Sequence, residues 1–250
     1  SQKISVTIQA RMNSSRLPGK VLAPICGKPA LELMVERLKT VKYLNNIIIA
    51  TTDNKIDDPI ARLADKLEVY CFRGSEENVL SRVLGAARAY PTDIIVQTTG
   101  DCPLIDPRII NKVIETYFNE KVDYCANIIE RTYPIGMDVQ VFSKSTLESV
   151  ERLTSNPEDL EHVSCYIYKN PQIYKLMNVS AEQSLFSPKL RLTLDTQEDL
   201  ELIIKIYEAL YSNQKIFFLD NILGFLQKNK NLKSINKHIK HKWLDFSKNK

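Results

Sequence analysis

Residues 4–20 read ISVTIQARMNSSRLPGK, an apolar stretch that runs directly into a loop of cations and hydroxyl groups. The apolar part, residues 4–10, indicates a buried strand. After the loop, PALELMVERLKTV at 29–41 has the spacing of an amphipathic helix, which Pro29 opens. A buried strand, a polar loop and a covering helix form the first unit of a sheet with helices packed on it.

The same alternation continues as far as residue 120. Further apolar runs predict strands at 45–52, 68–72 and 93–99. Helical spacing lies between and after them, at 57–67, 77–90 and 107–120. Apolar strands that alternate with helices of this length are typical of a parallel sheet covered on both faces. The sequence therefore predicts an α/β fold with a doubly wound, mostly parallel sheet.

A different pattern occupies residues 123–190. Extended segments follow one another there, namely VDYCAN, MDVQVF, QIYKLMNV and KLRLTL. Helical patterns at 143–153 and 158–170 separate them, and two more helices are predicted at 197–211 and 218–229. We interpret 123–190 as an insertion that adds antiparallel strands to a single domain of residues 1–250, which ends in a basic tail at 228–250.

Composition restricts the class of protein. The formal charge is +4, but residues 221–250 hold eight lysines and one aspartate, so the rest of the chain is net acidic. The tail has no repeated aromatic and basic pattern, so we expect a solvated lysine-rich helix there and no nucleic-acid partner. No apolar run approaches 18 residues, which predicts a soluble protein without membrane contact. Five cysteines without a C-x-x-C pair predict the reducing cytoplasm.

The loop after the first strand is the first candidate binding site. In an open α/β sheet, ligands bind at the carboxyl ends of the strands. This loop gathers Arg11, Arg16 and Lys20 within ten positions, and it matches neither the Walker loop nor the dinucleotide-binding loop. Like charges at close range repel by roughly a few kcal/mol per pair, so an anionic ligand explains their gathering most simply. We interpret the loop as a polyphosphate cradle; the alternative is a solvent-exposed basic turn.

Two aspartates follow other predicted strands at the same edge. Asp101 lies in TTGDCPLID at 98–106, and Asp195 lies in LDTQED at 194–199. Each by itself is also typical of a turn or a helix cap. Together they suit one Mg²⁺, which keeps several waters and bridges substrate phosphates. With the cationic loop they predict nucleotidyl transfer, whereas the three histidines do not have the spacing of a zinc site or a Ser-His-Asp set.

These motifs resemble a known family. IQARMNSSRLPGKVL at 8–22 resembles the N-terminal signature of the cytidylyltransferases that activate acidic sugars, the 3-deoxy-manno-octulosonate and acylneuraminate enzymes. The similarity is greatest to the branch of spore coat polysaccharide biosynthesis protein F. Further motifs match in order along nearly the whole chain: FRGSEENVLSR at 72–82, TTGDCPLIDP at 98–107, YPIGMDVQVF at 133–142, LEHVSCYIYKNP at 160–171 and LRLTLDTQEDLELI at 190–203.

The resemblance implies a Rossmann-like nucleotidyltransferase fold. It also implies a transferase that couples CTP to an acidic sugar with Mg²⁺, giving a CMP-sugar and pyrophosphate for surface polysaccharide or glycan synthesis. It assigns the metal to Asp101 and Asp195, and catalysis to Arg16, Lys20, Asp101 and Asp138. The nucleotide-binding residues that it implies are Ala10, Arg11, Ser15, Arg16, Lys20, Arg73, Ser75, Thr99 and Gly100. In such a reaction, positioning and electrostatics supply most of the acceleration.

The inserted segment is expected to bind the acceptor. Asp138 is a candidate to orient or deprotonate the attacking hydroxyl, and Glu161 and His162 are candidates to contact the sugar. Arg131 and Arg191 are candidates to bind the sugar carboxylate. Asp138 is equally typical of a turn before a strand, and Glu161–His162 of a helix surface. The resemblance further implies a homodimer formed through the inserted segment.

Two positions depart from the family pattern. Thr99 stands where octulosonate enzymes read Gln, and Asn13 stands where a small residue is usual. The sequence therefore supports the reaction class better than the acceptor, and a sugar phosphate is an alternative acceptor. A nucleotide-sugar-dependent glycosyltransferase is another alternative, although no D-x-D sequence follows a predicted strand. A non-catalytic nucleotide-sensing or scaffolding protein is the third, and the full set of cations and aspartates argues against it.

Overall fold

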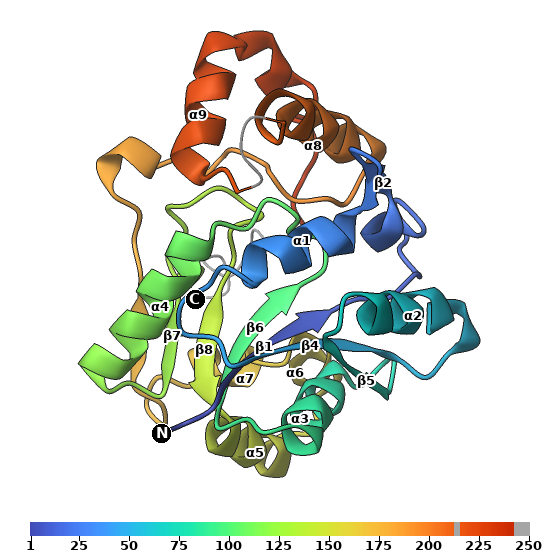
Figure 1. Ribbon diagram of the computed structural model, residues 1–250. Helices are drawn as coiled ribbons and strands as arrows, with labels where there is room; N and C mark the ends of the chain where they lie inside the picture. The colour runs from blue at the N-terminus through green and yellow to red at the C-terminus, as the bar shows by residue number, and fades with distance from the viewer. Residues whose placement is uncertain (213–215, 243–250) are drawn as a thin grey trace.

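A seven-stranded sheet organises the protein in the computed structural model, which describes residues 1–212 and 216–242 (Figure 1). The strand order is β5-β4-β1-β6-β8-β7-β9. The first four strands run parallel, namely β1 (Ile4–Gln9), β4 (Asn46–Thr52), β5 (Tyr70–Gly74) and β6 (Ile94–Thr99). The expectation of an α/β fold with a mostly parallel sheet is confirmed.

Helices join these strands and form a layer on each face of the sheet. The connections are α1 (Ala30–Leu38), α2 (Asp58–Lys66) and α3 (Val79–Ala89), and α4 (Pro107–Glu120) follows β6. Successive residues of a strand point to opposite faces. Val96 of β6 accordingly packs in the core that α1 and α4 share, whereas Ile95 packs with α3. The strands are therefore buried on both sides, which is why they are apolar throughout.

Residues 123–190, the segment predicted as an insertion, add the remaining strands to the β6 side of the sheet. β8 (Gln140–Ser143) pairs antiparallel with both β6 and β7 (Tyr124–Ala126), and β9 (Leu176–Asn178) pairs parallel with β7. The helices of this segment are α5 (Lys144–Leu153), α6 (Pro157–His162) and α7 (Cys165–Lys169). The single helix expected at 158–170 is wrong, because Val163, with φ 60°, separates α6 from α7.

The segment at 189–194 is not the expected strand. Within the described residues its pairing is limited to an isolated bridge between Ile135 and Arg191. Short elements complete the early part of the chain: the 3₁₀ turns η1 (Lys20–Leu22) and η2 (Lys55–Asp57), and the ribbon of β2 (Pro24–Ile25) and β3 (Lys28–Pro29).

The chain after residue 195 packs beside the α1 layer. It forms α8 (Gln197–Leu210), α9 (Leu219–Lys228) and the 3₁₀ turn η4 (Lys230–Ser234). Another 3₁₀ turn, η3 (Gln183–Leu185), lies before α8 in the chain. The lysine-rich helix expected over the tail is wrong for residues 229–242, because Asn236 turns into the protein and is 2% exposed. Residues 243–250 of that expected helix lie outside the described residues. None of the helices in the described parts of the chain has the length and hydropathy that a bilayer crossing needs.

Candidate active site

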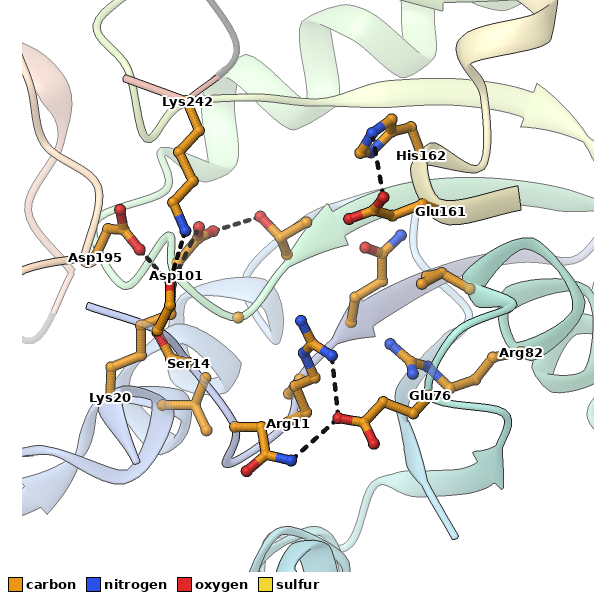
Figure 2. A pocket seen from close by; sticks show the side chains of 18 of the residues that line it. Arg11, Ser14, Lys20, Glu76, Arg82, Asp101, Glu161, His162, Asp195 and Lys242 are labelled. Carbon is orange, nitrogen blue, oxygen red and sulfur yellow. Dashed lines mark hydrogen bonds and ion pairs between the residues drawn. The ribbon is translucent and has the colours of Figure 1, made fainter. Parts of the chain in front are cut away.

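The carboxyl ends of β1 and β6 open into a cleft of about 990 Å³. Gln9 pairs with Thr99 across these two strands, so the loops that follow them face each other. The start of α3, the helix α6 and the end of the described chain complete the wall. Figure 2 labels lining residues Arg11, Ser14, Lys20, Glu76, Arg82, Asp101, Glu161, His162, Asp195 and Lys242. This is the edge at which parallel α/β sheets bind ligands.

Backbone contacts fix the loop of residues 10–20 on one side of the cleft. Met12 N donates a hydrogen bond to Asp57 Oδ1 (2.7 Å), and Gly19 N donates to Met12 O (2.8 Å). Gly19 has φ 73°, a left-handed conformation that glycine adopts without strain. The loop therefore folds back on itself and ends in η1, which begins with Lys20.

Lys20 brings the two predicted aspartates together. Its Nζ donates to Asp195 Oδ1 at 3.0 Å and lies 3.9 Å from Asp101 Oδ2. The backbone fixes the same arrangement, because Leu194 N donates to Asp101 O at 2.8 Å. Residues about ninety positions apart in the chain thus place their carboxylates around one ammonium group, as Figure 2 shows.

Asp195 is held in position by the start of α8. Its backbone N donates to Asp199 Oδ2 (3.0 Å), and Thr196 and Asp199 form a capping box. Burial disfavours the ionised carboxylate, but the charge and hydrogen bond of Lys20, together with Arg16 and Lys242, lower the pKa of Asp195 below the ordinary carboxyl value. Asp195 is therefore an anion at neutral pH.

The other end of the cleft contains a second polar network. Glu76 accepts hydrogen bonds from Arg11 Nη1 (3.1 Å), Asn13 Nδ2 (3.1 Å) and Asn54 Nδ2 (2.7 Å). The hydrogen bond from Asn13, with the charge of Arg11, lowers the pKa of Glu76. Arg82 is 3% exposed, and its Nε has no hydrogen-bond partner among the described residues. Donors of this kind suit the acceptor atoms of a nucleotide.

A family model described as cytidylyltransferase matches residues 5–236. The chain belongs to this cytidylyltransferase family. The matched residues include β6, all of β1 after its first residue, the cationic loop, and Asp101 and Asp195. The nucleotidyltransferase predicted from the motifs is thereby confirmed.

Curated relatives and a solved structure agree with the family. Spore coat polysaccharide biosynthesis protein SpsF of Bacillus subtilis is 34% identical over 206 residues, 80% of this chain and 85% of that protein. A 3-deoxy-manno-octulosonate cytidylyltransferase of Trichlorobacter lovleyi is 36% identical over 115 residues, 46% of this chain and 45% of that protein. The structure of a cytidylyltransferase from Leptospira borgpetersenii has a TM-score of 0.90 at 34% identity, covering 96% of this chain and 100% of that chain. The resemblance stated above is confirmed.

The donor set of this cytidylyltransferase fits a magnesium ion that is shared with phosphates. The carboxylates of Asp101 and Asp195 lie close together, because both are within 3.9 Å of the ammonium group of Lys20. Within residues 1–212 and 216–242, no cluster of three or more His, Cys, Asp or Glu side chains provides an all-protein metal cage. One or two carboxylates combined with substrate phosphates and water is the usual protein environment of Mg²⁺.

The structure places the predicted nucleotide-binding residues in two groups. Those that line the cleft are Ala10, Arg11, Ser15, Lys20, Thr99 and Gly100. Arg16, Arg73 and Ser75 are not among the lining residues. Arg73 Nε donates to Thr52 O (2.8 Å) and its Nη1 pairs with Asp58, while Ser75 Oγ accepts from Asn78 N at the start of α3. Arg16 lies behind Asp195, with Nη2 at 2.6 Å from Asp195 Oδ2.

The predicted acceptor residues are also divided. Glu161 and His162 line the cleft from α6, and burial lowers the pKa of His162. Arg131 and Asp138 lie outside the cleft lining and form a bidentate ion pair, with Nη1 at 2.7 Å from Oδ1 and Nη2 at 2.9 Å from Oδ2. Arg191 is 4% exposed, and its Nε and Nη2 both donate to a carboxylate, so the structure does not present it to the cleft.

The sequence did not single out several residues that take part in the site, among them Glu76, Arg82, Asp199 and Lys242. Glu76 and Arg82 lie within the motif at 72–82, which itself could have pointed to them. Asp199 follows Thr196 by three positions, the spacing of a capping box. Lys242 had no local signal, because nothing in the tail's lysine pattern distinguishes it from its neighbours.

Proposed function

We propose that the protein couples CTP to an acidic sugar of the ulosonic or nonulosonic class, releasing pyrophosphate and forming a CMP-sugar for surface polysaccharide or glycan synthesis. The observation that carries the proposal is the position of Lys20 between Asp101 and Asp195. A cation and two carboxylates at the end of β1 and β6 suit a nucleotide whose phosphates are bound by cations on one side and by a magnesium ion on the other.

The nucleotide is proposed to lie along the cleft, with its base toward Arg11 and Arg82 and its phosphates toward Lys20. Backbone groups of the loop at 10–20 and of Thr99–Gly100 line the same path. Asp101 and Asp195 would hold Mg²⁺, which supplies charge neutralisation at the phosphate oxygens when it is bound. Lys20 stabilises the negative charge that spreads onto the leaving pyrophosphate.

The acceptor is proposed to enter from the α6 side. Glu161 and His162 would contact the sugar hydroxyls there, while the Arg131–Asp138 pair is proposed to orient the acceptor group that reacts. The acceptor hydroxyl attacks the α-phosphorus of CTP, so a new P–O bond forms and the bond to pyrophosphate breaks. Asp138 is proposed to accept the hydroxyl proton, for which one of its carboxylate oxygens must leave the pair with Arg131. Arg191 is proposed to act through Asp199 and Asp195 instead of binding the sugar carboxylate.

The acidic-sugar class rests on similarity. The motif resemblance and the octulosonate cytidylyltransferase of T. lovleyi support it, and the polysaccharide role named for SpsF supports the broader purpose. The experiment that tests it is pyrophosphate release from CTP and Mg²⁺ with a panel of ulosonic acids, nonulosonic acids and sugar phosphates. Turnover with a sugar acid is expected. Turnover with sugar phosphates and with no sugar acid would show that the acceptor is a sugar phosphate instead.

Two variants make this experiment specific. Asp101→Asn keeps the shape of the side chain and removes the carboxylate charge, and it should reduce turnover by at least a hundredfold, or about 2.7 kcal/mol. Asp65→Asn makes the same change on the exposed surface of α2, outside the cleft, and should leave turnover unchanged. Sugar transfer without pyrophosphate release would instead favour a glycosyltransferase.

We also propose that the enzyme acts in the cytoplasm as a homodimer. The five free cysteines support a reducing compartment. Exposed apolar side chains on the inserted segment, Ile129 at 41% and Phe186 at 56%, support self-association through that segment. Light scattering coupled to gel filtration tests the dimer, and Phe186→Ser should shift it toward monomer.

A further inference from the structure

The C-terminal segment, defined here as residues 235–242, runs from the protein core to the cleft. Ile235 packs against the main hydrophobic core. Asn236 is buried, and its Nδ2 donates to Arg191 O (3.0 Å) and to Asp199 Oδ1 (2.9 Å). Asp199 is the same carboxylate that accepts from the backbone N of Asp195. The start of the segment is therefore fixed to the Asp199 carboxylate, which positions Asp195. Asp101 and Asp195, the two aspartates around Lys20, are called the acidic pair below.

The far end of the segment is fixed to the cationic loop. Arg16 Nη1 donates to Lys240 O at 3.2 Å, and Lys242 Nζ donates to Ser15 Oγ at 2.9 Å. Lys242 lines the cleft, and in Figure 2 its side chain extends toward Asp101 and Asp195. Lys242 thus approaches the site from the side opposite the loop that carries Lys20.

Arg16 is turned away from the cleft, so Lys242 is a second cation, besides Lys20, that can reach a ligand at this end of the cleft. Arg16 pairs with Asp195 and holds the carbonyl of Lys240, and it does not line the cleft. Of the cations at this end of the cleft within the described chain, Lys20 and Lys242 are the lining side chains. An ammonium group has three N–H donors. Among the described residues, Ser15 accepts one hydrogen bond from Lys242, which leaves two N–H groups that can bind an anion.

We propose that Lys242 binds the distal phosphates of the nucleotide; the hydrogen bond from Arg16 to Lys240 O helps to hold the segment that carries Lys242. This inference rests on the proposed function. The family match ends at residue 236, so it does not include Lys242. Distal phosphates are favoured over a sugar carboxylate because Lys242 contacts Ser15 of the cationic loop, whereas the proposed acceptor residues Glu161 and His162 lie on α6.

Calorimetric titration of the full chain with CTP, CMP and pyrophosphate, each with Mg²⁺, tests the proposal. Lys242→Ala should weaken CTP and pyrophosphate binding about tenfold, the effect of roughly one charge-assisted contact. Its affinity for CMP should stay within about twofold of the wild type, because CMP has no distal phosphates. Lys242→Arg keeps the charge and should recover most of the loss.

Lys237→Ala is the matched control, because it removes the same charge from an exposed lysine of the same segment that does not line the cleft. Its affinities should equal those of the wild type. Equal weakening of CTP by both variants would show a general charge effect and overturn the proposal. Unchanged CTP and pyrophosphate affinity in Lys242→Ala, with a lower melting temperature, would show that Lys242 only ties down the segment.

The wild type separates this proposal from the proposed function. A wild-type chain that binds no CTP overturns the proposed function and this inference together. A wild-type chain that binds CTP, with Lys242→Ala equal to it, overturns this inference alone.

Discussion

The buried ion pair of Arg191 and Asp199 is expected to contribute to the stability of the protein. It is also expected to position Asp195, one of the two aspartates around Lys20. Asp199 is fully buried and accepts from Arg191 Nε (2.8 Å) and Nη2 (2.9 Å). It also accepts from the backbone N of Asp195 and Thr196 and from Asn236 Nδ2. One carboxylate thus connects the core, the start of α8 and the C-terminal segment.

Asp199→Ala should cost about 4 kcal/mol of the free energy of unfolding, because the buried Arg191 guanidinium loses both hydrogen bonds to its nearest counter-charge and keeps only Asp195 Oδ2, 3.6 Å from Nη2. For a chain of this size, each kcal/mol corresponds to roughly 2–4 °C, so the melting temperature should fall by about 8–16 °C. Differential scanning calorimetry measures the change. A fall of less than about 2 °C would refute the argument that this pair depends on its charges.

A double variant tests the reason for this loss. Replacing both partners, as Arg191→Met with Asp199→Leu, removes the buried charge altogether and should recover much of the stability. CTP affinity should nevertheless be lower in the double variant than in the wild type, because Asp195 N and Thr196 N have lost their acceptor. Recovery of both properties would mean that Asp199 does not position the acidic pair.

Three further predictions follow from individual contacts. Gly136→Ala should destabilise the protein by about 3 kcal/mol, because Gly136 has φ +107° and a Cβ there would lie 2.6 Å from the Leu192 carbonyl carbon; an unchanged urea midpoint would contradict this. Burial lowers the pKa of His162 below 6.5, so the unfolded chain takes up the proton first and the free energy of unfolding should fall as pH drops below 6.5; His162→Gln should flatten that dependence in denaturation series at several pH values. Arg73→Ala should lower the melting temperature but leave the dissociation constant of CTP unchanged, because Arg73 contacts Thr52 O and Asp58 outside the cleft lining. Weaker CTP binding by this variant would show that Arg73 belongs to the nucleotide site.

Most of the sheet could be predicted because its signals are local. The apolar runs at 4–10, 45–52 and 93–99 correspond closely to β1, β4 and β6, since strands buried on both faces have few other compositions. The break at Val163 and the weak pairing at 189–194 could not be predicted, because packing against distant elements decides them. A helical pattern at 158–170 does not say whether tertiary contacts keep the helix intact.

The same distinction applies to the site. Asp101 and Asp195 were predicted to meet because both were expected after strands at the carboxyl edge of one sheet. They do meet, but the segment before Asp195 is not a strand of that sheet and is held by the hydrogen bond from Leu194 N to Asp101 O. Which cation faces the cleft depends on pairing between distant residues. Arg191 pairs with Asp199, Arg131 with Asp138 and Arg16 with Asp195, and each looked equally available as a free ligand in the sequence. Lys242 reaches the cleft because Asn236 is buried, which the lysine pattern of the tail does not encode.

A crystal structure of the protein with CTP and Mg²⁺ tests the central claim most directly. The account predicts triphosphate oxygens within hydrogen-bonding distance of Lys20 Nζ, with the metal between them and the carboxylates of Asp101 and Asp195. It also predicts the cytosine toward Arg11 and Arg82. A nucleotide bound elsewhere, or phosphates that contact neither Lys20 nor a metal held by these two aspartates, would contradict the account.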